Sequence, residues 1–266
     1  MHRCGEDATE EPLPGRITTT VRVGDTVRRS TGPWTPAVHA LLDHLERVGF
    51  TAAPRARGRD EQGRECLSYL PGDVAGSAPW PGWVWSDVTL RQVGELLREY
   101  HAAVASFVPP PDVVWRAGKV AMSEGQIVCH NDLSPLNVVH SGSRVSGFLD
   151  WDFASPALPK WDLAHVAWQF VPLHHPKLAD NLGYRHGERA QRLRTLCDAY
   201  RLHHAERNGF VQLVRDRVCA TRDGILAFAK RDSVFARLIE DGHVSDMDET
   251  IEFIDSNGGE LERLLH

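Results

Sequence analysis

One stretch constrains the fold more than any other: Ile127 to Phe153, which reads IVCHNDLSPLNVVHSGSRVSGFLDWDF. Its apolar runs predict two short strands, residues 127–129 and 145–149, with a tight turn at residues 141–143. Polar side chains stand between these strands or at their ends, and a strand–turn–strand unit would bring them near a common point. These side chains are Asp132, Asn137 and Asp150.

These three residue types suit phosphoryl transfer. The reaction needs a carboxylate to accept the proton of a hydroxyl, and hard oxygen ligands for Mg²⁺ bound to the nucleotide phosphates. The pattern Asp132-x4-Asn137 has the spacing of the catalytic Asp and the metal-binding Asn in the H-R-D-x-x-x-x-N loop. Asp150, at the end of a buried strand, would supply a second oxygen ligand. We therefore interpret Asp132 as the base, and Asn137 and Asp150 as magnesium ligands.

Other interpretations of these residues stay open. An Asp-x4-Asn pair is common by chance, and Asp132 could simply cap a turn. Asp150-Trp151-Asp152, taken alone, could be the metal site of a nucleotide-sugar transferase. We interpret the neighbouring His130 as a structural histidine buried in the loop rather than as a catalytic one.

Taken together, the motifs resemble the aminoglycoside phosphotransferase family, which is related to choline kinases and more distantly to protein kinases. The segments HNDLSPLNVV and GFLDWDFASPALPKWDLAHVAW carry the resemblance, with Asn131 in place of the usual Gly. The resemblance implies an α+β, two-lobed protein-kinase-like fold, with a small β-rich N-lobe and a larger, mainly helical C-lobe. It also implies that Asp162, in the DLA segment, anchors the catalytic loop by hydrogen bonds and does no chemistry.

On this interpretation the chain divides into three parts. Residues 1–15 are polar, contain two prolines and are predicted to be disordered. Residues 16–72 form the N-lobe, with antiparallel strands, one helix and a hinge near residues 67–72. Residues 73–266 form the C-lobe, which contains the catalytic loop 130–137, the metal-binding strand end 150–152 and the C-terminal acceptor-binding helices.

The N-lobe needs a cation to hold the nucleotide phosphates, which is a Lys in many kinases. No Lys precedes Lys119, so Arg28 or Arg29 must take this role. Alternation along a strand allows only one of them to face the site, and the family pattern favours Arg28. Arg can replace Lys here because its fork binds phosphate oxygens in a bidentate manner.

Two further N-lobe features depart from the family. The helix that opens at Thr35-Pro36 is predicted to have Thr as its N-cap, and it lacks the Glu that pairs with the strand cation. Val38 or His39 occupies the expected turn, and we interpret His39 as a half-exposed helix residue. No clear Gly-rich loop covers the phosphates, since only Gly15 and the threonines at 18–20 stand in that place.

The hinge is predicted from Cys66-Leu67-Ser68-Tyr69-Leu70-Pro71-Gly72, an apolar strand that ends in Pro-Gly. Adenine is expected to bind backbone N–H and C=O groups here, because its edge needs one donor and one acceptor. The nucleotide-binding residues are therefore predicted to include Ser68, Tyr69 and Leu70.

The C-terminal part is predicted to be helical at about residues 159–170, 188–208, 209–229 and 246–265. From Glu240 onward it is strongly acidic. The family resemblance places acceptor binding here, and acidic groups would attract a polycationic acceptor such as an aminoglycoside. A solvated acidic helix accounts for the same residues equally well.

Composition excludes several classes of protein. The chain has 266 residues, 42% of them hydrophobic, which is enough to bury a sizeable core. A net charge of −6 argues against a nucleic-acid partner. Five scattered cysteines without a CxxC pair indicate neither a disulfide framework nor structural zinc, and His174-His175 are interpreted as surface residues. With no signal peptide and no long apolar run, a cytoplasmic protein without a membrane span is expected.

The sequence therefore predicts a phosphotransferase that uses ATP, or GTP, with Mg²⁺ to phosphorylate a hydroxyl of a small molecule. One alternative is a metabolite kinase with a choline-like or sugar acceptor. Another is a nucleotide-binding immunity or regulatory protein without catalysis, which the altered N-lobe motivates. The acceptor and the oligomeric state are not specified by the sequence.

Overall fold

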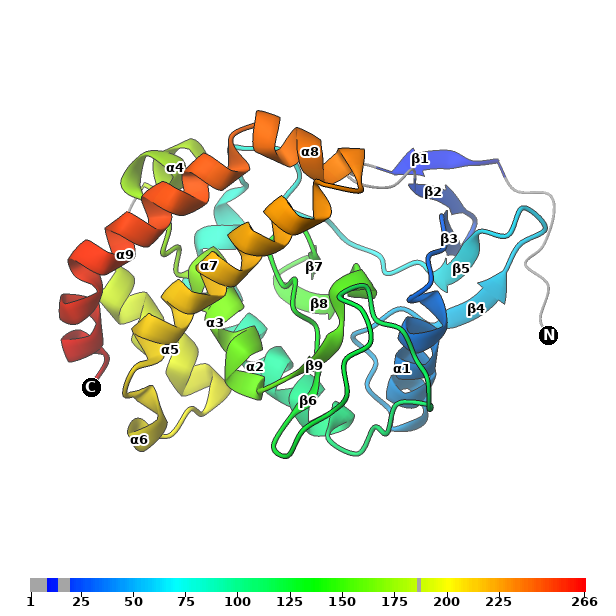
Figure 1. The fold of residues 1–266 in the computed structure, drawn as a ribbon, viewed down its shortest axis with the longest axis horizontal. Helices are drawn as coiled ribbons and strands as arrows, with labels where there is room; N and C mark the ends of the chain where they lie inside the picture. The colour runs from blue at the N-terminus through cyan, green and yellow to red at the C-terminus, as the bar shows by residue number, and fades with distance from the viewer. Residues whose placement is uncertain (1–8, 14–19, 186–187) are drawn as a thin grey trace. The chain divides into compact units, whose positions relative to one another are not determined.

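The computed structural model describes residues 9–13, 20–185 and 188–266 (Figure 1). The chain divides into two compact units. The first unit consists of Met1–Val74, Glu99–Asp132 and Asn137–Pro159. The second consists of Ala75–Arg98, Leu133–Leu136 and Lys160–His266.

The first unit contains an antiparallel sheet with the strand order β1-β2-β3-β5-β4. The strands are β1 (Glu11–Leu13), β2 (Thr20–Val23), β3 (Thr26–Arg29), β4 (Ala56–Arg59) and β5 (Glu65–Ser68). β2 and β3 form the expected hairpin, and Gly24 turns between them with a φ of 61°. The prediction of disorder is wrong for Glu11–Leu13, because these residues pair with β2 as an edge strand. Residues 1–8 and 14–15 of the segment predicted to be disordered lie outside the described residues, as do residues 16–19 of the N-lobe that was predicted to follow it.

Helix α1 (Thr35–Arg47) forms where the apolar spacing predicts it. Leu41, Leu42 and Leu45 recur at helical spacing and are fully buried. Thr35 is not the N-cap, however. Trp34 holds that position, and the Thr35 hydroxyl instead accepts a hydrogen bond from the Gly32 N–H at 2.9 Å.

The first unit also contains two small β units and the short helix η2 (Trp151–Phe153). β7 (Val138–Ser141) pairs with β8 (Arg144–Phe148) through the expected turn, and β6 (Ile127–Cys129) pairs with β9 (Ser155–Ala157). The partner of β6 is thus β9 rather than the strand after the turn.

The β7–β8 hairpin belongs to the same unit as the N-terminal sheet because hydrogen bonds tie it there. Phe148 N–H donates to Ala52 C=O, and Asp73 N–H donates to His140 C=O, both at 2.8 Å. Residues 99–132 and 137–159, which the sequence assigned to the C-lobe, accordingly group with residues 1–74.

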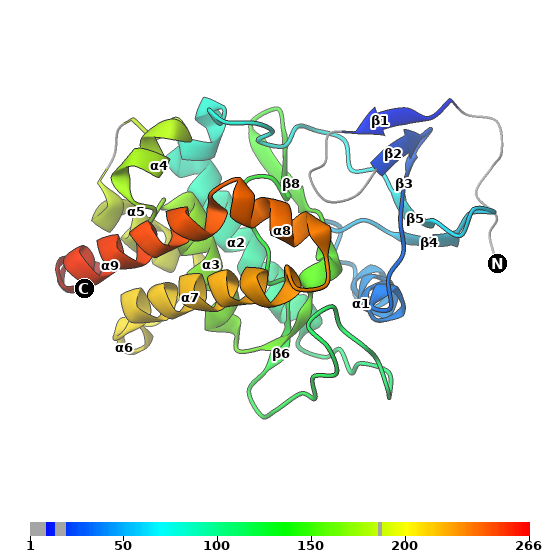
Figure 2. The same ribbon diagram turned by 45° about the horizontal axis from the view of Figure 1, so that its top comes forward.

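The second unit is mainly helical. α2 (Asp87–Val104) begins in it, and α7 (Phe210–Phe228) and α9 (His243–Leu265) lie side by side (Figures 1 and 2). The predicted helix at 188–208 is interrupted at Arg201, which adopts a left-handed conformation with a φ of 64°. The remaining elements of this unit are η1 (Gly82–Trp85), α3 (Pro159–Phe170), α4 (Pro176–Asn181), α5 (Arg189–Tyr200), α6 (His204–Arg207) and α8 (Ser233–Glu240).

Among the helices that the structure describes, none has both the length and the apolar character of a membrane span.

Candidate functional site

Asp132 and Asn137 contact each other within the first unit. The Asn137 amide nitrogen donates to the backbone C=O of Asp132 at 2.8 Å and to its carboxylate oxygen Oδ2 at 3.0 Å. The amide nitrogen of Asn137 is therefore committed to fixing the Asp132 carboxylate. No described residue donates a hydrogen bond to Asn137 Oδ1, which leaves this oxygen available as a metal ligand.

Asp150 is brought next to Asn137 by the β7–β8 pairing. Val138 is the register partner of Phe148, and one step further the Leu149 N–H donates to the Asn137 C=O at 2.8 Å. Asp150 follows directly and adopts a left-handed conformation, with φ 58° and ψ 67°. Such a conformation is uncommon for a residue other than Gly and is often found at functional sites.

Arg29, at the end of β3, contacts three carboxylates at once. Its Nε donates to Glu65 Oε1 at 2.5 Å, and its two terminal nitrogens donate to Asp150 Oδ1 at 2.7 Å and Asp152 Oδ1 at 2.6 Å. The side chain is only 8% exposed, so the charge depends on these partners. Burial acts to lower the pKa of Arg29, but the charges of Asp152, Asp150 and Glu65 outweigh it and raise the pKa.

The structure contradicts the predicted orientation of this strand. Arg28 extends to the opposite side from Arg29, as alternation along β3 requires, and its guanidinium lies 3.7 Å from Asp60 Oδ2. Arg29, and not Arg28, reaches the Asp150 carboxylate. The family pattern favoured Arg28 because it indicates the strand but not which face of the strand turns toward Asp150; which of the two arginines holds phosphate stays a prediction.

Glu65 supplies the carboxylate that the sequence analysis found missing from α1. It stands at the start of β5, directly opposite Arg29 in the β3–β5 register. Its second oxygen, Oε2, lies 2.8 Å from His39 Nε2 on α1. Burial acts to raise the pKa of Glu65, but the hydrogen bond with His39 and the charge of Arg29 lower it more. Sequence reasoning missed Glu65, although a charged residue opening a buried strand was a usable signal.

A second arginine, Arg116, supports the site from the irregular segment between α2 and β6. Its NH1 lies 3.2 Å from Asp152 Oδ2, so Asp152 bridges Arg116 and Arg29. The guanidinium stacks between the rings of Trp34 and Phe153, with centroid distances of 4.6 and 4.7 Å. Burial raises the pKa of Asp152, since the opposing charges of the two arginines do not fully offset it. No motif in the sequence pointed to Arg116.

The loop that carries Asp132 is held by its two preceding residues. His130 is fully buried, and its Nε2 lies 2.9 Å from the Leu149 C=O, as expected of a structural histidine. Asn131 has a φ of 64°, which explains why Asn can replace the usual Gly: Asn tolerates the left-handed region. Its amide also donates to the Ser155 hydroxyl at 3.0 Å, which ties the loop to β9.

The predicted hinge residues differ in what they can offer a nucleotide. The N–H of Ser68 donates to Arg55 C=O at 2.9 Å, and the N–H of Tyr69 donates to Asp25 C=O at 2.8 Å. These two N–H groups are therefore already engaged, and adenine binding at the hinge stays a prediction. Of the three predicted nucleotide-binding residues, Leu70 is the one whose N–H has no acceptor within the described parts of the chain.

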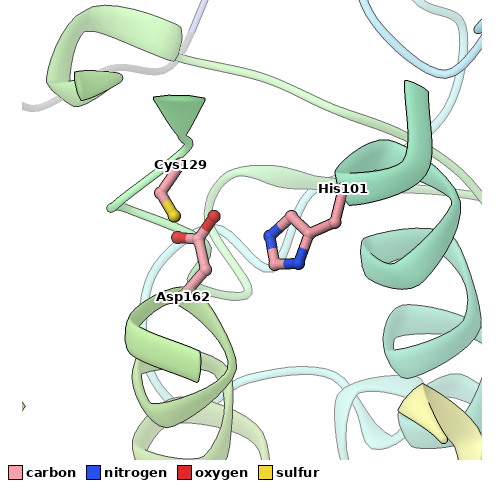
Figure 3. A group of neighbouring side chains, drawn as sticks. All are labelled: His101, Cys129 and Asp162. Carbon is pink, nitrogen blue, oxygen red and sulfur yellow. The ribbon is translucent and has the colours of Figure 1, made fainter. Parts of the chain in front are cut away.

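Several other residues singled out by sequence are buried. Asp162 lies in the first turn of α3 in the second unit and is fully buried, and its anchoring role remains a prediction (Figure 3). In the first unit, Cys129 at the end of β6 and His101 on α2 are also buried (Figure 3). His174 and His175 are 3% and 5% exposed, so their interpretation as surface residues is wrong.

Comparison with known proteins places this geometry in a family. The sequence model of the phosphotransferase enzyme family matches residues 113–196, which include Asp132, Asn137 and Asp150. The trifolitoxin immunity protein of Rhizobium leguminosarum bv. trifolii is 36% identical over 225 residues, covering 82% of this chain and 80% of that protein. The chain belongs to the phosphotransferase enzyme family.

This phosphotransferase family member is also similar to a homoserine kinase of Granulibacter bethesdensis, with 28% identity over 198 residues and 60% of each chain covered. Among solved structures, the amicoumacin kinase hAmiN in complex with AMP-PNP, Ca²⁺ and Ami has a TM-score of 0.61 at 12% identity, covering 91% of this chain and 88% of that one. The GDP complex of aminoglycoside 2'-phosphotransferase-IIIa has a TM-score of 0.57 at 14% identity, covering 92% of each. These likenesses confirm the predicted kinase-like fold.

Proposed function

We propose that this protein transfers the γ-phosphate of ATP, or GTP, to a hydroxyl of a small molecule. One observation carries the proposal: Asp132, Asn137 and Asp150 are joined within a single compact unit that also contains Arg29. Phosphoryl transfer depends mainly on positioning and on electrostatic stabilisation, and this arrangement provides both.

The residues present fit a magnesium ion. Asn137 Oδ1 and Asp150 Oδ2 receive no hydrogen bond from any described residue, and both are the hard oxygen ligands that Mg²⁺ prefers. The other Asp150 oxygen is held by Arg29 at 2.7 Å, which fixes the plane of the carboxylate. When bound, Mg²⁺ would neutralise charge on the β- and γ-phosphate oxygens.

The chain's own side chains would then divide the remaining work. Asp132 accepts the proton of the acceptor hydroxyl, and Asn137 holds its carboxylate in place. Arg29 uses three of its five N–H groups on carboxylates, which leaves one hydrogen on each terminal nitrogen for a phosphate oxygen. The Leu70 N–H is the backbone donor for the adenine or guanine edge.

The similar proteins support two alternatives, one a different kind of kinase and the other a protein without catalytic activity. Identity to a homoserine kinase supports a metabolite kinase, for which choline-like amines and sugars are further candidate acceptors. Identity to the trifolitoxin immunity protein supports a second candidate, a nucleotide-binding immunity protein without turnover. The intact set of Asp132, Asn137 and Asp150 favours catalysis over the second candidate.

A screen of nucleotide consumption separates these possibilities. Purified protein with Mg·ATP or Mg·GTP is offered aminoglycosides, choline-like amines, sugars and homoserine, and Asp132→Asn serves as the control. Acceptor-dependent consumption in the wild type, absent in the variant, supports the phosphotransferase. Tight nucleotide binding with no consumption for any acceptor class supports the non-catalytic immunity protein.

A further inference from the structure

The carboxylate that holds Arg29 comes from an unusual place for this family. The resemblance to kinases implies a Glu on the helix after the strand cation, but here Glu65 on β5 makes the contact with Arg29 Nε at 2.5 Å. Helix α1 reaches the same carboxylate through His39, whose Nε2 lies 2.8 Å from Glu65 Oε2. Each oxygen of Glu65 therefore has its own partner, one from the sheet and one from the helix.

The contacts that join His39, Glu65 and Arg29 are largely buried, so water cannot easily replace a lost partner. The side chains of Glu65 and Arg29 are 2% and 8% exposed, so neither can replace a lost partner with bulk water. His39 is 19% exposed and stands at the outer end of these contacts. If Glu65 Oε2 loses its partner, the carboxylate can rotate, and the Nε contact that orients the Arg29 fork loosens with it.

We propose that His39 is a positioning residue for phosphate binding, acting through Glu65 to orient Arg29. The inference rests on the proposed function, in which Arg29 holds phosphate. Helix α1 then contributes to the site by a hydrogen bond to a strand carboxylate rather than by an ion pair of its own. Removing the His39 donor lowers nucleotide affinity although His39 does not contact the nucleotide.

The test compares two substitutions that keep the residue polar. In His39→Gln, the amide nitrogen can occupy the place of the imidazole Nε2 and donate to Glu65, whereas in His39→Asn the shorter side chain cannot reach. Calorimetric titration with Mg·ATP should show affinity within about twofold of wild type for His39→Gln and about tenfold weaker binding for His39→Asn.

A matched control lies on the same helix. His44 is buried and its Nε2 lies 3.0 Å from the Ala103 C=O, away from Glu65. His44→Asn should lower the melting temperature yet leave Mg·ATP affinity unchanged. If His44→Asn and His39→Asn weaken binding equally, the effect is a general one of helix stability and the inference is overturned.

A second measurement tests the route through Glu65. In a Glu65→Gln background the His39→Asn substitution should change Mg·ATP affinity by less than about twofold. If His39→Asn weakens Mg·ATP binding as much in that background as in the wild type, His39 does not act through Glu65 and the inference is overturned. If His39→Asn binds like wild type while Arg29→Ala binds weakly, this inference fails and the proposed function stands. If wild-type protein binds neither Mg·ATP nor Mg·GTP, both fail together.

Discussion

Arg29 and Glu65 are direct register partners in β3 and β5, and the Arg29 Nε donates to Glu65 Oε1 at 2.5 Å. The register of two adjacent strands therefore orients the Arg29 guanidinium without a direct contact from a helix. The two terminal nitrogens of Arg29 contact Asp150 and Asp152. These contacts hold Arg29 in a fixed position relative to Asp150, the predicted metal ligand.

The first prediction concerns the two neighbouring arginines. Arg29→Ala leaves three carboxylates close together without their shared cation, so it should reduce stability by roughly 3–5 kcal/mol. Arg28→Ala loses the longer ion pair with Asp60, at 3.7 Å, and should cost less than Arg29→Ala does. Urea unfolding and Mg·ATP titration of both variants provide the measurement. A larger loss at Arg28 in both would contradict the assignment.

The second prediction concerns the magnesium ligand. Asp150→Ala removes a hard oxygen ligand and one partner of Arg29, so the part of the nucleotide affinity that depends on Mg²⁺ should disappear. Thermal shift with ATP, with and without Mg²⁺, measures this part separately. In wild type, Mg²⁺ should enlarge the shift, whereas in the variant the two shifts should agree. The same Mg²⁺ dependence in both proteins would exclude Asp150 as a ligand.

The third prediction concerns Asn131 and its left-handed backbone. Asn131→Ala loses the hydrogen bonds to Ser155 and places a less tolerant residue at a φ of 64°, so it should cost roughly 2 kcal/mol of unfolding free energy. Asn131→Gly loses the same hydrogen bonds but relieves the backbone, so it should be the more stable of the two variants. Chemical denaturation of the pair decides the matter. Equal stability would show that backbone conformation is not what selects Asn here.

The fourth prediction concerns pH and a histidine of the second unit. Burial lowers the pKa of His174 to about 3, with the charges of His175 and Arg189 adding to the effect. The ring accepts a hydrogen bond from Trp168 Nε1 at Nδ1, at 3.0 Å, and protonation there would break it. Between pH 3 and the ordinary pKa of 6.5 the unfolded chain binds more protons than the folded chain at this residue. Stability should therefore fall as the pH drops below 6.5.

This single group can contribute a slope of up to about 1.4 kcal/mol per pH unit. His174→Asn keeps an acceptor for Trp168 but cannot be protonated in this range, so it is the matched variant. Urea unfolding of both proteins at several pH values measures the slope. The variant should lose less stability than wild type on acidification, and parallel curves would contradict the assignment.

The elements of the site that depend on local pattern could be predicted from sequence. Apolar spacing predicted α1, and the Asp132-x4-Asn137 motif predicted which side chains lie together, because both signals act over a few neighbouring residues. The end of β8 next to Asp150 was predicted for the same reason.

The parts that depend on distant pairing could not be predicted. The pairing of β6 with β9 and the contact of Arg29 with Glu65 join segments far apart in the chain, and no local pattern specifies them. The absence of an earlier Lys limited the cation to Arg28 or Arg29, and strand alternation allowed only one of them to face the site, but the choice between them needed the register of β3 against β5. Arg116 stacks on rings from two separate segments of the chain, Trp34 and Phe153. The residues next to Arg116 in the sequence therefore give no signal of its role.

The most direct test of the account is phosphoryl transfer by Asp132→Asn, measured together with nucleotide affinity on the acceptor that the screen identifies. The substitution keeps the size of the side chain and its contact with Asn137 but cannot accept a proton. The account predicts that turnover falls by about 10²–10⁴-fold while Mg·ATP affinity stays close to wild type. Turnover near the wild-type level in Asp132→Asn would contradict it.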